Sequence, residues 1–308
     1  MPLVAEAVAG LSAPAAHVSP KFFYDALGSR LFDAITELDE YYPTRTEASI
    51  LASHAADIAA AAIAATGAHA ALVDLGAGNC AKAARLFATL APARYVAVDI
   101  SVDFLREALN ALQGQHEAID MVGVGLDFST RLALPAGVLD GPALVFYPGS
   151  SIGNFNPDEA LRLLRECHAL VNSGGGGGLL IGVDRVKSYA LLNAAYDDPL
   201  GVTAAFNLNL LRHLNRLIGS DFDPRQWRHA GQFNRAASRV EMHLEARLPL
   251  LVRWPGGERR FAAGERIHTE NSYKWHAADF EALLRDAGFA RVQGWTDSQG
   301  WFSVMLAH

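Results

Sequence analysis

Cysteine is scarce in this chain. Only Cys80 and Cys167 occur among the 308 residues, and neither lies in a spacing that binds metal. So few thiols exclude a disulfide framework and are typical of a protein from a reducing compartment. We expect both cysteines to be small buried apolar residues. The 11 histidines are scattered, with no two at a ligand spacing beside a carboxylate, so we expect no metal site.

Clusters of basic residues are also missing. The chain has 26 Lys and Arg residues against 33 Asp and Glu residues, a formal net charge of −7, and no run of Lys or Arg. Nucleic-acid binding normally needs a clustered basic surface, so we expect no nucleic-acid partner. A small molecule is the partner that this pattern favours. The sequence carries no signal for an oligomeric state.

Long hydrophobic runs are missing as well. Residues 1–16 are mildly apolar but lack the basic start of a signal peptide. The Ala-rich run 52–65 contains His54 and Asp57, and it is too short and too weakly hydrophobic to cross a bilayer. We therefore predict a helix there, no membrane association, and a cytoplasmic protein.

The chain does contain a regular alternation of apolar strands and helices. Strands are predicted at 71–75, 94–98, 121–126, 143–147 and 178–183, with helices at 81–90 and 104–112. Such alternation predicts a parallel sheet that is covered on both faces. Near the end, a helix at 280–287 precedes two strands, 290–295 and 302–307, around a turn at 297–300. We predict that this hairpin closes one edge of the sheet.

The alternation breaks between Asp184 and Trp275. Residues 199–217 have helical spacing, the run 238–252 alternates with one apolar side, a turn follows at 255–257, and then a run at 259–269. This pattern predicts a helix-plus-hairpin insertion that forms a smaller α+β domain together with the N-terminal segment. The expected boundaries are 58–185 and 276–308 for the sheet domain, and 1–57 and 186–275 for the second domain.

A glycine-containing turn directly follows the first predicted strand. Gly76 and Gly78 lie in the segment Asp74–Cys80, where backbone without side chains lets a ligand approach the carboxyl end of a strand. Gly-x-Gly alone is a weak signal, and the third glycine of dinucleotide-binding proteins is absent, which disfavours a nicotinamide dehydrogenase. The five glycines at 174–178 are not followed by Lys-Ser or Lys-Thr, so a flexible turn is expected there instead of a phosphate loop.

The next two strands also end in acidic residues. Asp99 could accept hydrogen bonds from both hydroxyls of a ribose, although a carboxylate there could also cap the next helix, as Ser101 could. Asp127 could accept from an adenine amino group, with the ring of Phe128 beside it. Together with the glycine turn, these residues predict a nucleoside site without phosphate-binding chemistry. S-adenosylmethionine (SAM) fits this description.

Several further segments form an ordered set along the chain. They are Lys21–Asp25, Glu40–Arg45, Pro148–Phe155, Ala195–Asp198, Thr203–Asn207, Val240–Met242 and Ile267–Lys274. From about Pro20 to the end, this set resembles the L-histidine Nα-methyltransferase family of ergothioneine biosynthesis. The resemblance implies a Rossmann-like class I SAM-dependent methyltransferase, with a mostly parallel α/β sheet and a smaller substrate-binding domain. The implied reaction is trimethylation of the α-amino group of free histidine to hercynine.

The resemblance also implies roles for individual residues. SAM would be held by Gly76, Gly78, Lys82, Asp99, Asp127 and Phe128. Asn154 and Tyr24 would be the catalytic residues, with Asn154 and Tyr196 on the amino-acid backbone and Tyr24 beside the reacting amine. The imidazole would be surrounded by Tyr41, Met242, Glu270 and Ser272. Where many family members have Thr-Glu-Ile-Ser, this chain has Asn271 in the third place; it alternates away from Glu270, so we expect little effect on specificity.

Structural roles remain open for most of these residues. Met242 could fill a core, the three tyrosines could be packed aromatics, and Asn154 could be a turn residue. His268 lies on an alternating run, which favours a structural role over a general base. Two other functions also remain open. One is N-methylation of another amino acid, such as a tryptophan derivative, and the other is a SAM-binding regulatory protein without catalysis.

Overall fold

The computed structural model describes residues 2–308, and the chain divides into two compact units. The sheet unit comprises Pro43–Val186 and Lys274–His308. The second unit comprises the chain up to Tyr42 together with Lys187–Tyr273. Each unit is described by itself below.

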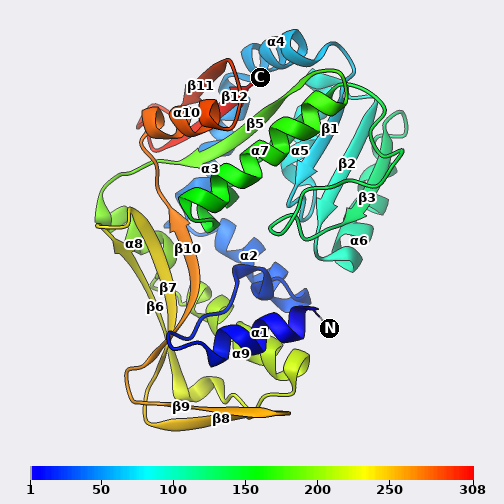
Figure 1. The fold of residues 1–308 in the computed structure, drawn as a ribbon. Helices are drawn as coiled ribbons and strands as arrows, with labels where there is room; N and C mark the ends of the chain where they lie inside the picture. Colours follow the sequence, from blue (N-terminus) through cyan, green and yellow to red (C-terminus); the bar gives the residue numbers. More distant parts are fainter. Residues whose placement is uncertain (1) are drawn as a thin grey trace. The chain divides into compact units, whose positions relative to one another are not determined.

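The sheet unit contains one seven-stranded sheet in the order β11-β12-β5-β4-β1-β2-β3 (Figure 1). The five strands from β1 to β5 are parallel, whereas β12 runs antiparallel to both β5 and β11. The strands are β1 (Ala71–Leu75), β2 (Arg94–Asp99), β3 (Asp120–Gly125), β4 (Ala143–Tyr147), β5 (Gly177–Asp184), β11 (Val292–Thr296) and β12 (Phe302–Ala307). The predicted α/β fold, a mostly parallel sheet closed by a C-terminal hairpin, is confirmed.

Helices cover both faces of this sheet and bury an apolar cluster under each. The helices are α3 (Tyr42–Ser53), α4 (Ala55–Thr66), α5 (Ala81–Leu90), α6 (Val102–Gln113), α7 (Pro157–Ser173) and α10 (Ala277–Asp286). α7 and α10 pack on one face, and α3 to α6 contribute to the cluster on the other. Because the central strands are buried on both sides, their sequences are continuous apolar runs, as in the fully buried β4.

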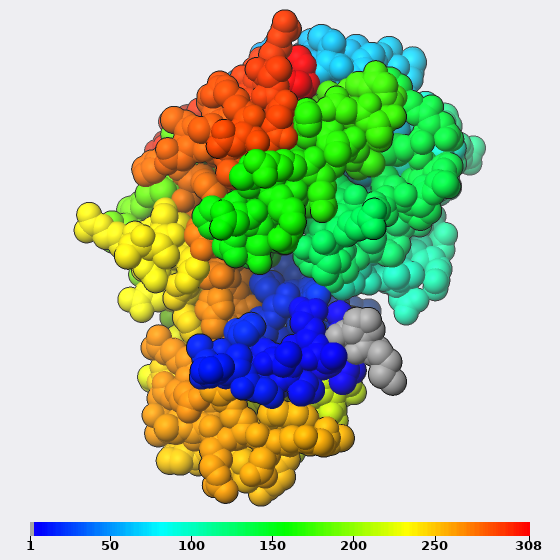
Figure 2. Space-filling model, in the orientation of Figure 1, coloured from blue at the N-terminus to red at the C-terminus, as the bar shows by residue number. Residues whose placement is uncertain are grey.

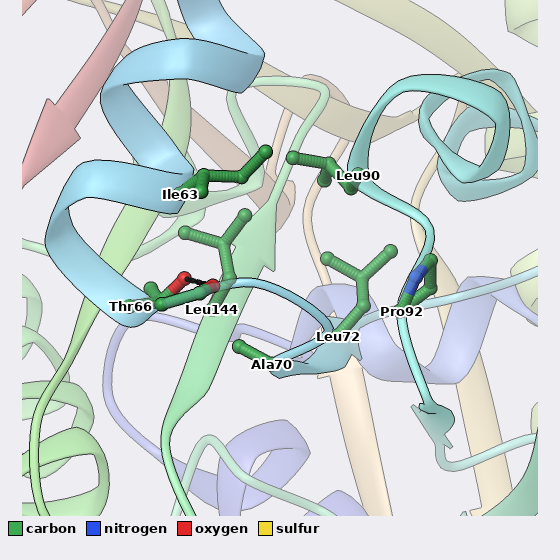
Figure 3. A pocket seen from close by; sticks show the side chains of 8 residues that line it. Ile63, Thr66, Ala70, Leu72, Leu90, Pro92 and Leu144 are labelled. Atoms are coloured by element: carbon green, nitrogen blue, oxygen red, sulfur yellow. Dashed lines mark hydrogen bonds between the residues drawn. The ribbon is translucent and has the colours of Figure 1, made fainter.

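One end of the sheet is closed by apolar side chains. Figure 3 shows Leu72 of β1 and Leu144 of β4 beside Ile63 of α4 and Leu90 of α5, around a small hollow. These residues lie at the amino ends of the strands. Polar residues gather at the carboxyl ends instead, as described below.

The N-terminal boundary of the sheet unit differs from the expected one. Residues 43–57 were expected in the second domain, but the structure places them in the sheet unit. The reason is packing, because Ile50 and Leu51 of α3 join Ile58 of α4 in the cluster under the sheet. The helix predicted at 52–65 is α4, which begins at Ala55, and α4 is bent by 76° from α3, which ends at Ser53. Within residues 2–308, no single helix is long and apolar enough to cross a membrane, although α3 and α4 taken together have the length and composition to do so.

The second unit combines helices with two small antiparallel sheets. Its strands form a three-stranded sheet in the order β10-β7-β6 and a separate hairpin of β8 and β9. Its elements are α1 (Pro2–Ser12), η1 (Pro20–Phe23), α2 (Ala26–Thr36), α8 (Tyr189–Tyr196), α9 (Val202–Ile218), η3 (Pro224–Gln226), β6 (Trp227–Asn234), β7 (Arg239–Ala246), β8 (Leu250–Trp254), β9 (Gly257–Phe261) and β10 (Arg266–Tyr273). The alternating run 238–252 is two strands instead of one, and β6 was not predicted.

A β-bulge at Thr269 interrupts the pairing of β10 with β7. His268 pairs with His243, but Glu270 and not Thr269 pairs with Met242. Thr269 is fully buried, and its hydroxyl donates to the carbonyl oxygen of Met242 at 3.0 Å. The bulge therefore puts Glu270 on the same face as Met242.

The N-terminal segment lies against the free edge of β10. The amide of Val18 donates to the carbonyl of His268, and the amide of His268 donates to the carbonyl of Ala16. Figure 2 shows blue residues of the N-terminal segment beside orange residues of the same unit. This pairing covers an edge strand that would otherwise present open hydrogen-bonding groups, and it agrees with the predicted joining of the N-terminal segment to the insertion.

A buried ion pair marks the two places where the chain leaves and re-enters the sheet unit. The ammonium group of Lys274 lies 2.8 Å from a carboxylate oxygen of Asp184, and both side chains are at most 1% exposed. The amide of Trp275 donates to the carbonyl of Asp184, and the amide of Val186 donates to the carbonyl of Trp275. The two crossings are thus joined by backbone and side-chain bonds within the sheet unit.

Candidate active site

The glycine turn follows β1 at the carboxyl edge of the sheet. Gly76 and Gly78 have φ angles of 71° and 54°, which side-chain-bearing residues rarely adopt. The amides of Gly76 and Ala77 both donate to the carbonyl oxygen of Val98 in β2. The turn therefore lies beside the end of the neighbouring strand, as predicted for a cofactor loop.

Asp99, at the end of β2, organises this turn. One of its carboxylate oxygens accepts from the amide of Gly78 at 2.9 Å, and the other accepts from the amide of Ser101 at 2.8 Å. The side chain of Ser101 forms no capping bond to α6. Each oxygen of a carboxylate has a second lone pair, so the structural role of Asp99 and acceptance of ribose hydroxyls are compatible.

Asp127 and Phe128 follow β3 at the same edge. The amide of Leu126 donates to the carbonyl of Asp99, which keeps the ends of β2 and β3 together. Asp127 accepts from the amide and hydroxyl of Ser129. The ring of Phe128 packs edge-on against Tyr147 of β4, and its tip would lie 3.9 Å from a Cβ on Gly76.

Lys82, in the first turn of α5, reaches the segment that follows β4. Its ammonium group lies 2.9 Å from a carboxylate oxygen of Glu47, on α3. The other oxygen of Glu47 accepts from the amide of Gly149, directly after β4. The sequence did not indicate Glu47, which lies two residues beyond the Glu40–Arg45 segment, because an acidic residue in a helix of mixed polarity is no signal of a buried site.

Asn154 lies in the same segment. It ends the short 3-10 helix η2 (Ser151–Asn154), which follows Gly149 and the buried Ser150. Ser150 has a left-handed backbone, with a φ of 57°, and its hydroxyl oxygen accepts from the amide of Asp184 at 2.8 Å. A non-glycine residue held in this conformation is common near functional sites.

A buried carboxyl group lies beneath the glycine turn. Asp74 is 1% exposed, one of its oxygens accepts from the hydroxyl of Tyr95 at 2.7 Å, and the other has no partner. Burial raises the pKa of Asp74 to about 7, against the opposing effects of the Tyr95 hydrogen bond and the charge of Lys82. Asp74 is a second residue whose environment the sequence did not reveal.

Replacement of Asp74 by Asn should change how stability depends on pH. The raised pKa means that the folded state binds a proton more tightly than the unfolded state. The free energy of unfolding therefore falls as the pH rises from about 3.8 to about 7. Asp74→Asn lacks this proton. We expect its free energy of unfolding, relative to the native protein, to increase by up to about 1.4 kcal/mol per pH unit in that window and then to level off.

Urea unfolding from pH 5 to pH 8 measures this effect. Asp120→Asn, which removes an exposed carboxylate at the amino end of β3, is the control for the loss of one negative charge. A constant difference between Asp74→Asn and the native protein over this pH range would contradict the raised pKa.

The other predicted residues lie in the second unit, where aromatic rings form a connected series. Tyr24 packs edge-on against Phe32, Phe32 against Tyr41, and Tyr41 against Tyr196, with ring centroids 5.7, 6.1 and 6.2 Å apart. Tyr41 and Tyr196 are each 8% exposed. The structure therefore brings the three predicted tyrosines together through Phe32, which the sequence analysis did not single out.

Polar groups from β10 adjoin this series. The hydroxyl groups of Tyr196 and Ser272 lie 2.7 Å apart. Glu270 is half-buried and pairs with the buried Met242 across the sheet. Asn271 pairs with Glu241 and accepts from the ring of His268 at 2.9 Å, which fits the prediction that Asn271 alternates away from Glu270 and that His268 has a structural role.

His229 of β6 contacts the backbone of Tyr196. One ring nitrogen lies 2.8 Å from the carbonyl oxygen of Tyr196, and the other lies 2.8 Å from the amide nitrogen of Asn207. Burial lowers the pKa of His229, which favours the neutral ring. A neutral imidazole that donates to Tyr196 and accepts from Asn207 satisfies both contacts.

The predicted site residues thus form two groups. The cofactor residues and Asn154 lie at the carboxyl edge of the sheet in one unit, and the tyrosines, Met242, Glu270 and Ser272 lie together in the other. Both cysteines are buried. In the part of the chain that the structure describes, no group of three or more His, Cys, Asp or Glu side chains could hold a metal ion.

The carboxyl edge of the sheet fits a nucleoside bearing an amino acid. It offers side-chain-free backbone at Gly76 and Gly78, an aromatic ring at Phe128, and carboxylates at the ends of β2 and β3. A cation from Lys82 stands beside the exit of β4. These groups match the base, the ribose and the amino-acid carboxylate of SAM, and the described contacts provide no phosphate-binding loop.

Comparisons with known proteins agree with this chemistry. A family described as histidine-specific, SAM-dependent methyltransferases matches residues 3–308. The chain is 40% identical to a histidine N-alpha-methyltransferase of Mycolicibacterium smegmatis and 38% identical to one of Mycobacterium tuberculosis, covering 97% of this chain and 92% of each relative. It is 24% identical to an L-tryptophan methyltransferase of Psilocybe serbica, covering 92% of this chain and 85% of the relative.

Proposed function

Because the chain belongs to the family of histidine-specific, SAM-dependent methyltransferases, we propose that it methylates the α-amino group of free L-histidine three times. The product is hercynine, an intermediate of ergothioneine biosynthesis, and the reaction takes place in the cytoplasm. The observation that carries the proposal is the match over nearly the whole chain to relatives named for this activity. The polar and aromatic side chains around Tyr196 and Ser272 are of the kinds that could bind the backbone and imidazole of histidine.

The cofactor residues have separate tasks in this proposal. Gly76 and Gly78 would let the backbone approach SAM, while Asp99 would accept from its ribose and Asp127 from its adenine amino group. Phe128 would contact the adenine, and Lys82 would bind the carboxylate. SAM, when bound, supplies a methyl group that is already activated by the sulfonium. The remaining task of the protein is to position the amine.

The second unit provides recognition of the amino acid. Glu270 accepts one N–H of the imidazole, and Ser272 bonds to the other ring nitrogen. Tyr41 and Met242 enclose the ring with aromatic and apolar surface. Two polar groups at a fixed separation select a ring with two separated nitrogens, because an analogue without them would leave buried polar groups unpaired.

Asn154, Tyr196 and Tyr24 act on the backbone and amine of the substrate. Asn154 and Tyr196 hold the amino-acid backbone, so that the lone pair of the amine keeps one direction through three methylations. Tyr24 bounds the space that the growing trimethylammonium group fills. The amine releases its protons to water, since no side chain is assigned as a base.

Mass spectrometry tests this proposal directly. The purified protein is incubated with SAM and each of the common L-amino acids. We expect trimethylated histidine alone. Modification of a tryptophan or another amino acid would retain the methyltransferase and overturn the assigned pocket, whereas SAM binding without any product would favour a regulatory protein.

A further inference from the structure

Glu47 occupies an unusual position for a carboxylate. It is 2% exposed and lies on α3, yet its two oxygens contact two other parts of the sheet unit. One accepts from the ammonium group of Lys82 at 2.9 Å, and the other from the amide of Gly149 at 2.7 Å. Burial of a carboxylate is costly unless it is paired and hydrogen-bonded, and here both oxygens are.

The surrounding backbone leaves room for this pair. A Cβ on Gly182, near the carboxyl end of β5, would lie 2.0 Å from the Glu47 oxygen that accepts from Gly149. A Cβ on Gly149 would lie 2.8 Å from the ammonium nitrogen of Lys82. Any side chain at either position would therefore displace the carboxylate or the ammonium group. The two glycines and the ion pair fit together as one arrangement.

The segment that receives the bond from Glu47 leads to Asn154. Gly149 is its first residue, and Ser150 follows with a left-handed backbone, which is unfavourable for a residue other than glycine. Two bonds oppose this cost, one from the Gly149 amide to Glu47 and one from the Asp184 amide to the Ser150 hydroxyl. Glu47 thus contacts both the cation assigned to SAM and the loop that carries Asn154.

We propose that Glu47 is a positioning residue, whose carboxylate fixes the Lys82 ammonium group and the 149–154 loop in the places that SAM and the amino acid require. The proposal rests on the proposed function, in which Lys82 binds SAM and Asn154 binds the amino acid. Two donors converge on Glu47, and only a carboxylate offers an acceptor at both ends. A glutamine would accept one of the two and turn its amide hydrogens toward the other.

Glu47 affects the affinity for SAM in two opposite ways. Its negative charge partly cancels the attraction of Lys82 for a carboxylate, whereas its bond holds Lys82, which is 33% exposed, against rotation into solvent. A lysine side chain has many rotamers, so the loss of its bond to Glu47 would cost Lys82 its fixed orientation. We expect this loss to exceed the gain from removing the Glu47 charge, so the affinity for SAM should fall when Glu47 is replaced.

Calorimetric binding of S-adenosylhomocysteine, the product of SAM, tests the proposal without any amino-acid substrate. We expect Glu47→Gln to weaken binding about 10-fold and, at saturating SAM, to lower kcat for histidine about 10-fold. The effects of Glu47→Gln and Lys82→Met on affinity should not add, because both remove the same contact. Asp120→Asn, which breaks the exposed ion pair with Arg94 in the same unit, should leave both quantities unchanged.

A merely structural role would lower stability alone, so thermal unfolding is measured in parallel. If Glu47→Gln does not fold, Glu47→Asp keeps the charge but is too short for both donors, and it should show the same two losses. Unchanged or tighter binding, or additive effects with Lys82→Met, would overturn the proposal. If the native protein binds S-adenosylhomocysteine but methylates a different amino acid, the proposed function fails while the binding result still decides the role of Glu47.

Discussion

Asn154→Ala should lower kcat for histidine methylation about 100-fold while binding of SAM survives. Methyl transfer requires a lone pair in line with the activated methyl group, and small misplacement of a reacting group costs roughly this factor. Asn154 is the last residue of η2, on a loop held by hydrogen bonds to Glu47 and Asp184. The backbone that carries its side-chain amide is therefore fixed in place. Truncation removes the amide but leaves the glycine turn and Asp99 in place.

Single-turnover kinetics and calorimetric titration with SAM separate the two effects. The matched control is Asn156→Ala, two residues further along. Asn156 caps α7 by accepting from the amide of Glu159, so its loss should cost about 1 kcal/mol of stability and little activity. Equal losses of turnover in both variants would show that Asn154 acts through the loop and not through the substrate.

Glu270→Ala should lower kcat/KM for histidine about 100-fold, mainly through KM. A hydrogen bond to a charged group contributes about 1.5–3 kcal/mol, and its removal leaves an imidazole N–H unpaired in a half-buried place. The effect should be smaller for an amino acid with an apolar aromatic side chain. The ratio of kcat/KM for histidine and tryptophan is therefore the quantity to measure.

Asn271→Ile provides the control for Glu270→Ala. Asn271 is the next residue on the same strand, but it pairs with Glu241 on the opposite face and contacts His268. Because its side chain points away from Glu270, the ratio for the two amino acids should stay within about twofold of the native value. A change of specificity in Asn271→Ile equal to that in Glu270→Ala would contradict the assigned face.

The sheet unit was largely predictable, because its central strands are buried on both faces. Such strands are continuous apolar runs, and the helices between them repeat apolar residues at helical spacing. β6 escaped prediction because its sequence, Trp227–Asn234, mixes polar, glycine and aromatic residues without clear alternation. The structure divides the chain after Tyr42 and not at residue 57, and the sequence did not indicate this because helical spacing does not say which core a helix covers.

The candidate site was predictable only where chemistry is local. The glycine turn and the carboxylates after β2 and β3 follow their strands directly, so strand prediction places them. Glu47 could not be found in this way, since its partners lie 35 and 102 residues away in the chain. The residues assigned to the imidazole came from the resemblance, because their meeting depends on how β7 and β10 pair.

The bulge at Thr269 determines which residues of β10 pair with which residues of β7. Without it, Thr269 would stand opposite Met242, Glu270 would face Glu241, and Ser272 would turn to the outer side together with His268. Two like charges would then oppose each other, and the inner face would exchange its acid and hydroxyl for Thr269 and Asn271. A register shift of one residue would thus change which side chains lie on the same face as Met242, although the sequence of the strand stays the same. Among relatives, insertions or deletions around this strand should therefore change substrate preference more abruptly than point substitutions within it.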